Sequence, residues 1–279
     1  MALPRVAVII SNYNYGDFVL DAIDSALNQD YEGDLRVYVL DDGSSDGSWD
    51  KIKNKYSENF SYSEDSETLK KPYYSGPFEY FQCDSLNLWA YRIDNSGAST
   101  ARNVAIWEAW GWADYFAILD ADDMYFPSKI SKHVNKLLEH KEIGVAYSDY
   151  IIHKTHYVNI DYKKYEYKYP YSIKELHKQC IVHSAGVIKK EYLKKVILNN
   201  DEFYDSNLHG PASKGFIGCT EDYDLWIRLA NTCMANHIAE PLSFVRETGQ
   251  NQSMKMNQNI FIDNMQRIKG RDEQIYTEN

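Results

Sequence analysis

The sequence has no apolar run long enough to cross a membrane, which takes about 18–20 consecutive apolar residues in a helix. It also has no hydrophobic core of a secretory signal, because Met1–Arg5 leads directly into the short apolar segment Val6–Ile10. We therefore expect neither a membrane span nor export, and a cytoplasmic location.

Cysteine is scarce. The four cysteines, Cys83, Cys180, Cys219 and Cys233, are far apart and form no CxxC pair. Disulfide-stapled scaffolds and zinc sites use cysteines in closer, paired patterns. We therefore expect free thiols in a reducing compartment.

The chain also lacks an excess of positive charge, since its formal net charge is −11 at pH 7. Proteins that bind nucleic acid through phosphate contacts, or that lie on anionic membranes, are usually basic. Both roles are disfavoured for the chain as a whole. A local basic patch would still be compatible with this charge, so a nucleic acid acceptor is disfavoured rather than ruled out.

What is present is an ordinary globular composition, with 279 residues, 44% hydrophobic and 25% charged. This length allows one large domain or two small ones with a sizeable core.

The most informative stretch is the apolar run Tyr115–Leu119, followed by Asp120, Asp122 and Asp123. A short unbroken apolar run predicts a strand buried on both faces, as in a parallel sheet. Open α/β sheets bind ligands where such strands end.

Three clustered carboxylates repel one another unless a cation lies among them. Hard oxygen ligands on a short turn suit Mg²⁺ or Mn²⁺ shared with a phosphate. The alternative is a solvated acidic turn, and this stretch alone does not decide between the two. An EF-hand is excluded, because its ligand spacing and its glycine are absent after Asp123.

Two βα units precede this stretch. The strand Val6–Ile10 ends in a polar turn, and a helix follows over Val19–Leu27 with Asp17 as its expected N-cap. The next strand, Val37–Leu40, ends in Asp41–Asp42. This alternation of strands and helices predicts right-handed βαβ connections and a parallel sheet. The polar ends of its strands are expected to lie at one edge of the sheet.

The stretch Tyr56–Asn87 has no stable period, and we interpret it as a surface excursion before a strand at Leu88–Ile93. A helix with small residues then begins near Ala98 and ends at Gly111. Arg102 lies in its early turns, either as a surface residue or directed to the strand ends. Pro127 is expected at the first position of the helix that follows.

Two later segments have both structural and functional interpretations. Tyr150–Lys178 is rich in tyrosine and lysine, which favours an edge strand guarded by lysines over an aromatic, basic acceptor surface. Thr220 can cap a helix that carries Glu221 and Asp222 in its first turn. These acids could serve the helix dipole alone or act as functional groups.

Five separated motifs agree in order and spacing with those of a known family. They are Val8–Asn14, Leu40–Gly47, Asn95–Asn103 (NSG followed by ARN), Leu119–Asp123 as a DxD element, and Thr220–Trp226 as an ED element. With these motifs the chain resembles glycosyltransferase family 2, the inverting enzymes of GT-A fold that use nucleotide sugars. The resemblance covers residues 5 to about 230. It implies an α/β fold with a mostly parallel, Rossmann-like central sheet flanked by helices, and a smaller mixed region on the acceptor side.

The resemblance also implies roles for individual residues. Binding of the nucleotide sugar would fall to Ser11, Tyr13, Asn14, Asp42, Arg102, Asp120 and Asp122, with Asp42 accepting from the base. Asp122 and Asp123 would ligate Mn²⁺ or Mg²⁺, and Asp222 would be the catalytic base, with Glu221 as the close alternative.

The expected enzyme is a soluble, metal-dependent inverting glycosyltransferase that moves a sugar, by default from a UDP-sugar, to an acceptor hydroxyl. Such a single displacement needs a carboxylate to take the acceptor's proton and a cation for the leaving diphosphate. The acceptor is left open among glycan, polymer and other molecules, and nothing indicates the oligomeric state. We predict a GT-A domain over residues 1–245, with halves at about 1–125 and 126–245, and a C-terminal segment 246–279 packed on it.

The sequence departs from the family pattern in two places. Arg246–Thr248 has threonine where the family often has a histidine near the metal, so the third metal ligand is open. The stretch between the Asp42 and Asn95 motifs is also longer than usual.

Two alternatives remain: a sugar-nucleotide-binding module without turnover, and a haloacid-dehalogenase-type phosphatase with Asp120 as nucleophile. The phosphatase motif normally comes first in its fold, whereas two βα units precede it here.

Overall fold

The computed structural model describes residues 2–56, 67–153, 165–166, 170–182, 185–209, 220–248, 251 and 256–277. All structural statements below concern these residues. Within them, no helix is long and apolar enough to cross a membrane. Cys83, Cys180 and Cys233 are free thiols, as expected, and Cys219 lies outside the described residues.

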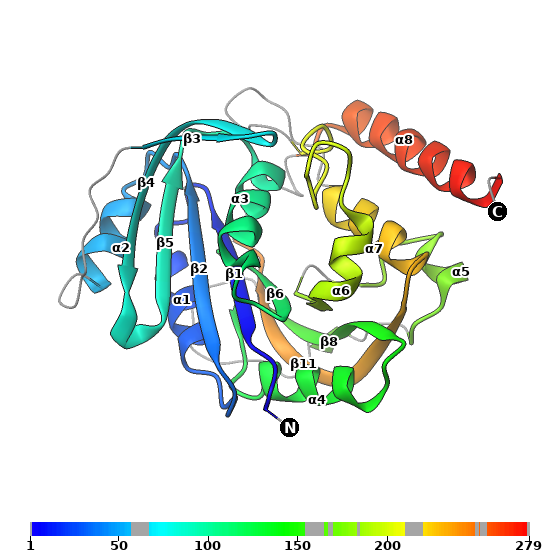
Figure 1. Cartoon of the computed structure of the whole chain (residues 1–279), viewed down its shortest axis with the longest axis horizontal. Helices are drawn as coiled ribbons and strands as arrows, with labels where there is room; N and C mark the ends of the chain where they lie inside the picture. The colour runs from blue at the N-terminus through cyan, green and yellow to red at the C-terminus, as the bar shows by residue number, and fades with distance from the viewer. Residues whose placement is uncertain are drawn as a thin grey trace.

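A large mixed sheet forms the centre of the molecule (Figure 1). Its strands run in the order β3-β4-β5-β2-β1-β6-β10-β8-β11-β7, and β9 pairs with β8. The strand bounds are β1 Val6–Asn12, β2 Leu35–Asp42, β3 Glu67–Lys71, β4 Tyr74–Cys83, β5 Leu88–Ile93, β6 Tyr115–Asp120, β7 Met124–Tyr125, β8 Ile143–His153, β9 Tyr165–Glu166, β10 Val187–Lys189 and β11 Met234–Arg246.

Helices cover both faces of this sheet. Their bounds are α1 Val19–Leu27, α2 Ser48–Tyr56, α3 Ala98–Trp110, α4 Lys129–Glu139, α5 Ile173–Leu176, α6 Lys190–Leu193, α7 Glu221–Ala230 and α8 Gln258–Thr277. Figure 1 shows α3 on one face of the first strands and α1 on the other. The arrangement confirms the predicted α/β fold with a central sheet flanked by helices.

The four strands β5, β2, β1 and β6 are parallel, and their register brings their polar ends together. Ser11 at the end of β1 pairs with Leu40 of β2 on one side and with Asp120 of β6 on the other. Asp42 at the end of β2 pairs with Ile93 of β5. The carboxyl ends of parallel strands therefore meet at one edge, as the βαβ pattern predicts.

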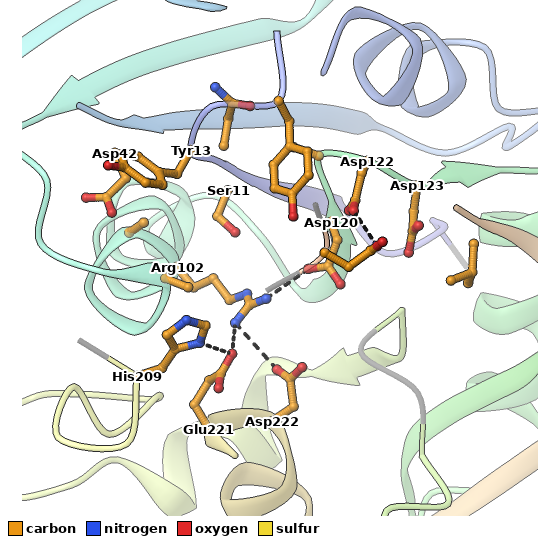
Figure 2. A pocket seen from close by; sticks show the side chains of 17 residues that line it. Ser11, Tyr13, Asp42, Arg102, Asp120, Asp122, Asp123, His209, Glu221 and Asp222 are labelled. Carbon is orange, nitrogen blue, oxygen red and sulfur yellow. Dashed lines mark hydrogen bonds and ion pairs between the residues drawn. The ribbon is translucent and has the colours of Figure 1, made fainter. Parts of the chain in front are cut away.

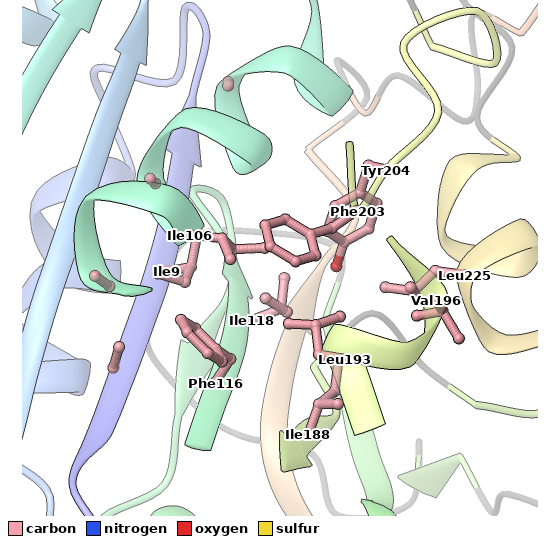
Figure 3. Packing of buried hydrophobic residues seen from close by; sticks show 14 of the residues in the cluster. Ile9, Ile106, Phe116, Ile118, Ile188, Leu193, Val196, Phe203, Tyr204 and Leu225 are labelled. Atoms are coloured by element: carbon pink, nitrogen blue, oxygen red, sulfur yellow. The ribbon is translucent and has the colours of Figure 1, made fainter. Parts of the chain in front are cut away.

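The unbroken apolar character of β1 follows from burial on both faces. Val8 packs into the cluster under α1, α2 and α4, whereas its neighbour Ile9 packs into the cluster under α3. Figure 3 shows Ile9 beside Ile106 of α3 and Phe116 of β6. Because successive side chains in a strand point to opposite faces, each face needs its own apolar set.

The surface excursion expected over Tyr56–Asn87 is wrong for most of its length. Residues 67–83 form β3 and β4, and β4 pairs antiparallel with β5 and so extends the sheet. Phe81 of β4 is only 1% exposed. Only some residues of β4 are buried, and they do not alternate regularly with exposed ones. The alternation of apolar and polar residues that predicts a strand is therefore weak in this stretch. Residues 57–66 lie outside the described part.

Two expected helix starts and one expected capping bond also differ from the structure. Asp17 does not cap α1, which begins at Val19, and its carboxylate instead lies 3.2 Å from Lys51 Nζ. Pro127 precedes α4, which begins at Lys129. Thr220 is the N-cap residue of α7, but its side chain makes no capping bond.

Within the tyrosine- and lysine-rich segment Tyr150–Lys178, residues 154–164 and 167–169 lie outside the described part. Within the described part, the short strand β9 at Tyr165–Glu166 pairs antiparallel with β8. The choice between an edge strand and an acceptor surface stays a prediction. The same holds for the predicted division at residue 245, although β11 ends at Arg246 and α8 follows it.

Candidate active site

A cavity of about 270 Å³ lies at the carboxyl edge of the parallel strands (Figure 2). It is lined from both halves of the chain, by Ser11, Asn12, Tyr13, Tyr15, Asp42, Ala98, Ala101, Arg102, Asp120, Ala121, Asp122, Asp123, His209, Glu221, Asp222, Val245 and Asn251. With the exception of Asn14, every site residue expected from the sequence lines this cavity.

Asn14 does not line the cavity. Its backbone has a positive φ of 58°, and its side-chain oxygen accepts a hydrogen bond of 2.8 Å from the amide of Ser45. Asparagine adopts such left-handed backbone more readily than most residues. The structure therefore gives Asn14 a local role, in holding the turn after β1 against the turn after β2.

The adjacent acids at the end of β2 face opposite ways. Asp41 is fully buried and accepts hydrogen bonds from the Asn12 amide at 2.7 Å and from the Ser44 backbone at 3.0 Å. Asp42 lines the cavity and accepts from the backbone amides of Ser96 and Gly97, at 2.7 and 2.9 Å. Burial nevertheless raises the pKa of Asp42 to about 7.

The three acids at the carboxyl end of β6, Asp120, Asp122 and Asp123, form the other wall of the cavity. Asp122 and Asp123 are 6% and 4% exposed, and Asp123 accepts a 3.0 Å hydrogen bond from the Arg246 backbone amide. Burial, followed by the charge of Asp120, raises the pKa of Asp122 to about 7. Burial and the charges of its two neighbours also raise the pKa of Asp123 well above its usual value.

This donor set fits a divalent cation that is shared with a phosphate. Within the described part of the chain, no three His, Cys, Asp or Glu side chains could hold an ion by themselves. Mg²⁺ and its relatives are commonly bound by one or two carboxylates, with substrate phosphates and water completing the shell. Two buried carboxylates, Asp122 and Asp123, match that requirement, and their pKa values are raised even though the charge of Arg246 opposes the shift.

Arg102 lies at the centre of the site. Its side chain is 7% exposed, and it donates hydrogen bonds of 2.8 Å to Asp120 and 2.7 Å to Glu221. It therefore joins α3 to β6 and to α7, as Figure 2 shows. Of the two interpretations left open by the sequence, a surface arginine is wrong, and Arg102 is directed to the strand ends.

Glu221 and Asp222 are adjacent in sequence, but their surroundings differ. Glu221 is 3% exposed and lies 2.9 Å from His209 Nδ1 as well as 2.7 Å from Arg102. Burial would raise the pKa of Glu221, but His209 and Arg102 stabilise its charged form and lower it overall.

Asp222 makes only a weaker contact with Arg102, at 3.6 Å. Its side chain is 25% exposed where it lines the cavity. Burial raises the pKa of Asp222 to about 7, and the charge of Glu221 adds to this, although Arg102 opposes it. A carboxylate with a pKa near neutrality is suited to general base catalysis, whereas the ion-paired Glu221 is not.

Asn251, rather than Thr248, reaches the acid cluster. The Asn251 amide donates to Asp122 at 2.9 Å and to the Arg246 carbonyl at 2.7 Å. Its oxygen accepts from the Thr248 backbone amide at 2.8 Å. The position that the family often fills with histidine therefore supports Asn251, which in turn bonds Asp122.

Sequence reasoning missed three polar cavity residues, Tyr15, His209 and Asn251. Tyr15 follows a recognised motif by one residue, so a wider window after β1 would have included it. His209 and Asn251 come from irregular segments with no period or motif. No signal in the sequence alone could have linked them to residues that are distant along the chain.

A family model for glycosyl transferase family 2 matches residues 7–70 and 89–197, which is more than half of the chain. The chain belongs to glycosyltransferase family 2. The family match removes the support for the phosphatase alternative. Between the two matched segments it omits residues 71–88, a stretch that contains β4. This agrees with the expectation that the family pattern is extended here.

Curated relatives in the family include an uncharacterized glycosyltransferase of Methanocaldococcus jannaschii, 28% identical over 85% of this chain and 67% of its own length. A second, from Escherichia coli, is the UDP-Glc:alpha-D-GlcNAc-diphosphoundecaprenol beta-1,3-glucosyltransferase WfaP. It is 32% identical over 53% of this chain and 47% of its own length. Two rickettsial relatives are matched over only 31% and 58% of their length.

Solved structures share the fold. TarS of S. aureus in complex with UDP-GlcNAc superposes with a TM-score of 0.60 at 16% identity, covering 89% of this chain and 60% of that one. The mannosyltransferase PcManGT of Pyrobaculum calidifontis, in complex with GDP-Man and Mn²⁺, gives a TM-score of 0.58 at 17% identity. It covers 91% of this chain and 60% of that one. This family member thus spans about 60% of the length of these two proteins.

Proposed function

We propose that this protein transfers a sugar from a nucleoside diphosphate sugar to an acceptor hydroxyl, by a single displacement that inverts the anomeric carbon. The observation that carries the proposal is the position of Asp222. Its carboxylate opens into the same cavity as Asp42 and the acids after β6, whereas Glu221 beside it is held by Arg102 and His209.

In this reaction the acceptor hydroxyl gives its proton to the carboxylate of Asp222. Its oxygen forms a bond to the anomeric carbon while the bond from that carbon to the diphosphate oxygen breaks. Because attack comes from the side opposite the leaving group, the configuration inverts. Ser11, Tyr13 and Asp42 would contact the nucleotide, since they line the cavity on the side of β1 and β2.

Asp122 and Asp123 would hold Mg²⁺ or Mn²⁺, which when bound neutralises the charge that develops on the leaving diphosphate. The charges on the cavity wall support the requirement for a cation. Six carboxylates line it (Asp42, Asp120, Asp122, Asp123, Glu221 and Asp222) with Arg102 as the lining arginine. An anionic diphosphate would be repelled from such a wall unless a cation accompanied it.

We propose UDP as the nucleotide, supported by the UDP-glucose named for WfaP and the UDP-GlcNAc bound to TarS. The GDP-Man bound to PcManGT makes GDP the main competitor. A thermal-shift panel of UDP, GDP and dTDP, each with Mg²⁺, Mn²⁺ or EDTA, tests the choice. A ligand that binds only the folded state raises the melting temperature. We expect a clear shift with UDP and metal, and a much smaller one with UDP in EDTA.

Release of UDP from UDP-sugars then tests turnover. Asp222→Asn should abolish it while UDP binding with metal stays nearly unchanged. The matched variant Asp50→Asn changes an exposed acid on α2 outside the cavity and should keep full turnover. Full turnover in Asp222→Asn would overturn the base assignment. Metal-dependent UDP binding without turnover on any UDP-sugar would instead identify a binding module that lacks turnover.

A further inference from the structure

The C-terminal helix α8 presents one buried face to the catalytic side of the molecule. Asn264 and Ile268, one turn apart, are 6% and 2% exposed, and Arg271 follows on the same face. Ile268 packs into the core cluster that also contains Leu225 of α7. Figure 1 shows α8 next to α7, beyond the part of the chain matched by the family model.

The side-chain amide of Asn264 connects two segments that carry active-site residues. It donates 2.9 Å hydrogen bonds to the Leu208 carbonyl and to the Thr220 hydroxyl. Leu208 immediately precedes His209, and Thr220 immediately precedes Glu221. His209 and Glu221 in turn lie 2.9 Å apart in the cavity wall.

This use of Thr220 explains why its side chain does not cap α7. A threonine at an N-cap normally accepts from a backbone amide of the first turn. Here no such bond forms, and the hydroxyl accepts from Asn264. One buried amide, with its two hydrogens, therefore fixes the spacing between the end of one segment and the start of the other.

We propose that Asn264 is a positioning residue for the catalytic acids: by holding Leu208 and Thr220 together, it keeps His209 against Glu221. The role of this contact in catalysis rests on the proposed function. With His209 in place, Glu221 stays ionised and retains Arg102, while Asp222 remains open to the cavity.

The groups that face this pair come from every packed element. They are Arg102 of α3, Asp120 of β6, Tyr204 of the preceding loop, Asp222 of α7 and Asp42 of β2, whose carboxyl interacts with the charge of His209. Tyr204 lies with its ring 5.3 Å from the Arg102 guanidinium carbon and is fully buried. If His209 withdrew, the negative charge of Glu221 would have less compensation, and the charged form of Asp222 would become less favourable.

The first test is structural and needs no substrate. The imidazole nitrogens of His209 are followed by ¹⁵N NMR, with the resonance identified by its loss in His209→Gln. We expect Asn264→Ala to move this resonance. Arg271→Ala is the matched control, because Arg271 docks the same helix through the side-chain carboxylates of Asp224 at 2.6 Å and Asp205 at 2.5 Å, whereas Asn264 bonds Leu208 and Thr220 themselves. It should leave the His209 resonance in place.

The second test is kinetic and uses UDP-glucose with Mg²⁺ as the probe. Asn264→Ala should lower kcat for UDP release about tenfold or more, since small misplacements of catalytic groups have large effects on rate. The KM should change little, because the nucleotide side of the cavity is untouched. Its pH–rate profile should move to higher pH. Thr220→Ser should retain wild-type rates, whereas Thr220→Val, which lacks the acceptor oxygen, should resemble Asn264→Ala.

The double variant Asn264→Ala, His209→Gln tests whether Asn264 affects the rate of UDP release through His209. If Asn264 acts through His209, its substitution should have little further effect once His209 has been replaced. The proposal is overturned if the His209 resonance is unchanged in Asn264→Ala, or if Arg271→Ala moves it equally. Absence of UDP release by the wild-type protein would count against the proposed function, and the NMR result would still decide the role of Asn264.

Discussion

Arg102 Nη1 lies 2.7 Å from Glu221 Oε1 in a buried ion pair between residues 119 positions apart. The other terminal nitrogen of Arg102 lies 2.8 Å from Asp120. One guanidinium therefore connects the nucleotide side of the cavity with the helix that carries the proposed base. The planar, forked geometry of arginine allows both contacts at once, which a lysine could not make in the same way.

Replacing Arg102 should destabilise the fold. Arg102→Met keeps much of the side-chain volume but leaves Glu221 and Asp120 without their cation. Removing one partner of a buried ion pair typically costs about 3–5 kcal/mol, and we expect a loss of this order in the free energy of unfolding by urea. Arg102→Lys should lie between the wild type and Arg102→Met. A loss below about 1 kcal/mol in Arg102→Met would contradict a central role for this pair.

The pH dependence of turnover should follow Asp222. Burial raises its pKa to about 7, and the base works only in the ionised form. We therefore expect kcat/KM for UDP release to rise with pH through about 7 and to fall about tenfold per unit well below it. The measurement is made between pH 5 and 9 with saturating Mg²⁺. A flat profile over this range would argue against Asp222 as the base.

The same raised pKa has a consequence for stability. Between the unfolded value near 4 and about 7, the folded protein keeps a proton on Asp222 that the unfolded chain loses. The contribution of this group to stability therefore declines as pH rises through that window. Asp222→Asn is neutral at every pH, so its stability relative to wild type should increase from pH 5 to pH 8, by on the order of 1 kcal/mol or more. Chemical denaturation at both pH values checks this, and an unchanged difference would contradict it.

Asp122→Asn should separate metal binding from nucleotide binding. We expect the affinity for UDP in the presence of Mg²⁺ to fall at least about tenfold, as is usual when a metal site loses a charged ligand. The weak affinity in EDTA should remain unchanged. Isothermal titration calorimetry measures both. Asp114→Asn, which affects an exposed pair with Arg5 outside the cavity, is the control and should bind like the wild type.

Asn251 should matter more than Thr248, although Thr248 occupies the position of the family histidine. Asn251→Ala removes the 2.9 Å hydrogen bond to Asp122, and we expect severalfold weaker binding of UDP with Mg²⁺. Thr248→Val keeps the backbone amide that donates to Asn251 and should have the smaller effect. The reverse order of effects would show that Thr248 itself contributes to the metal site.

Much of the site was predictable because its residues follow strand ends in recognisable motifs. The register of β1, β2 and β6 follows from short apolar runs, and it brings Asp42 and Asp120 to one edge. The strands β3 and β4 were missed because outer strands bury few of their residues and their period is weak. That the Asn14 side chain contacts Ser45 outside the cavity lining could not be predicted, because its motif does not specify which way a turn side chain points.

The sequence by itself determined the family, the parallel arrangement of the first strands and the choice of acids, since these depend on local patterns. Only the tertiary structure decided which of two adjacent acids is free to act. Glu221 and Asp222 are chemically similar neighbours in one helix turn, and the sequence favours Asp222 only through the resemblance to the family. The distinction comes from Arg102 and His209, which reach Glu221 from distant parts of the chain, and from Asn264, which holds one of those parts in place. Long-range contacts of this kind exist only once the chain has folded.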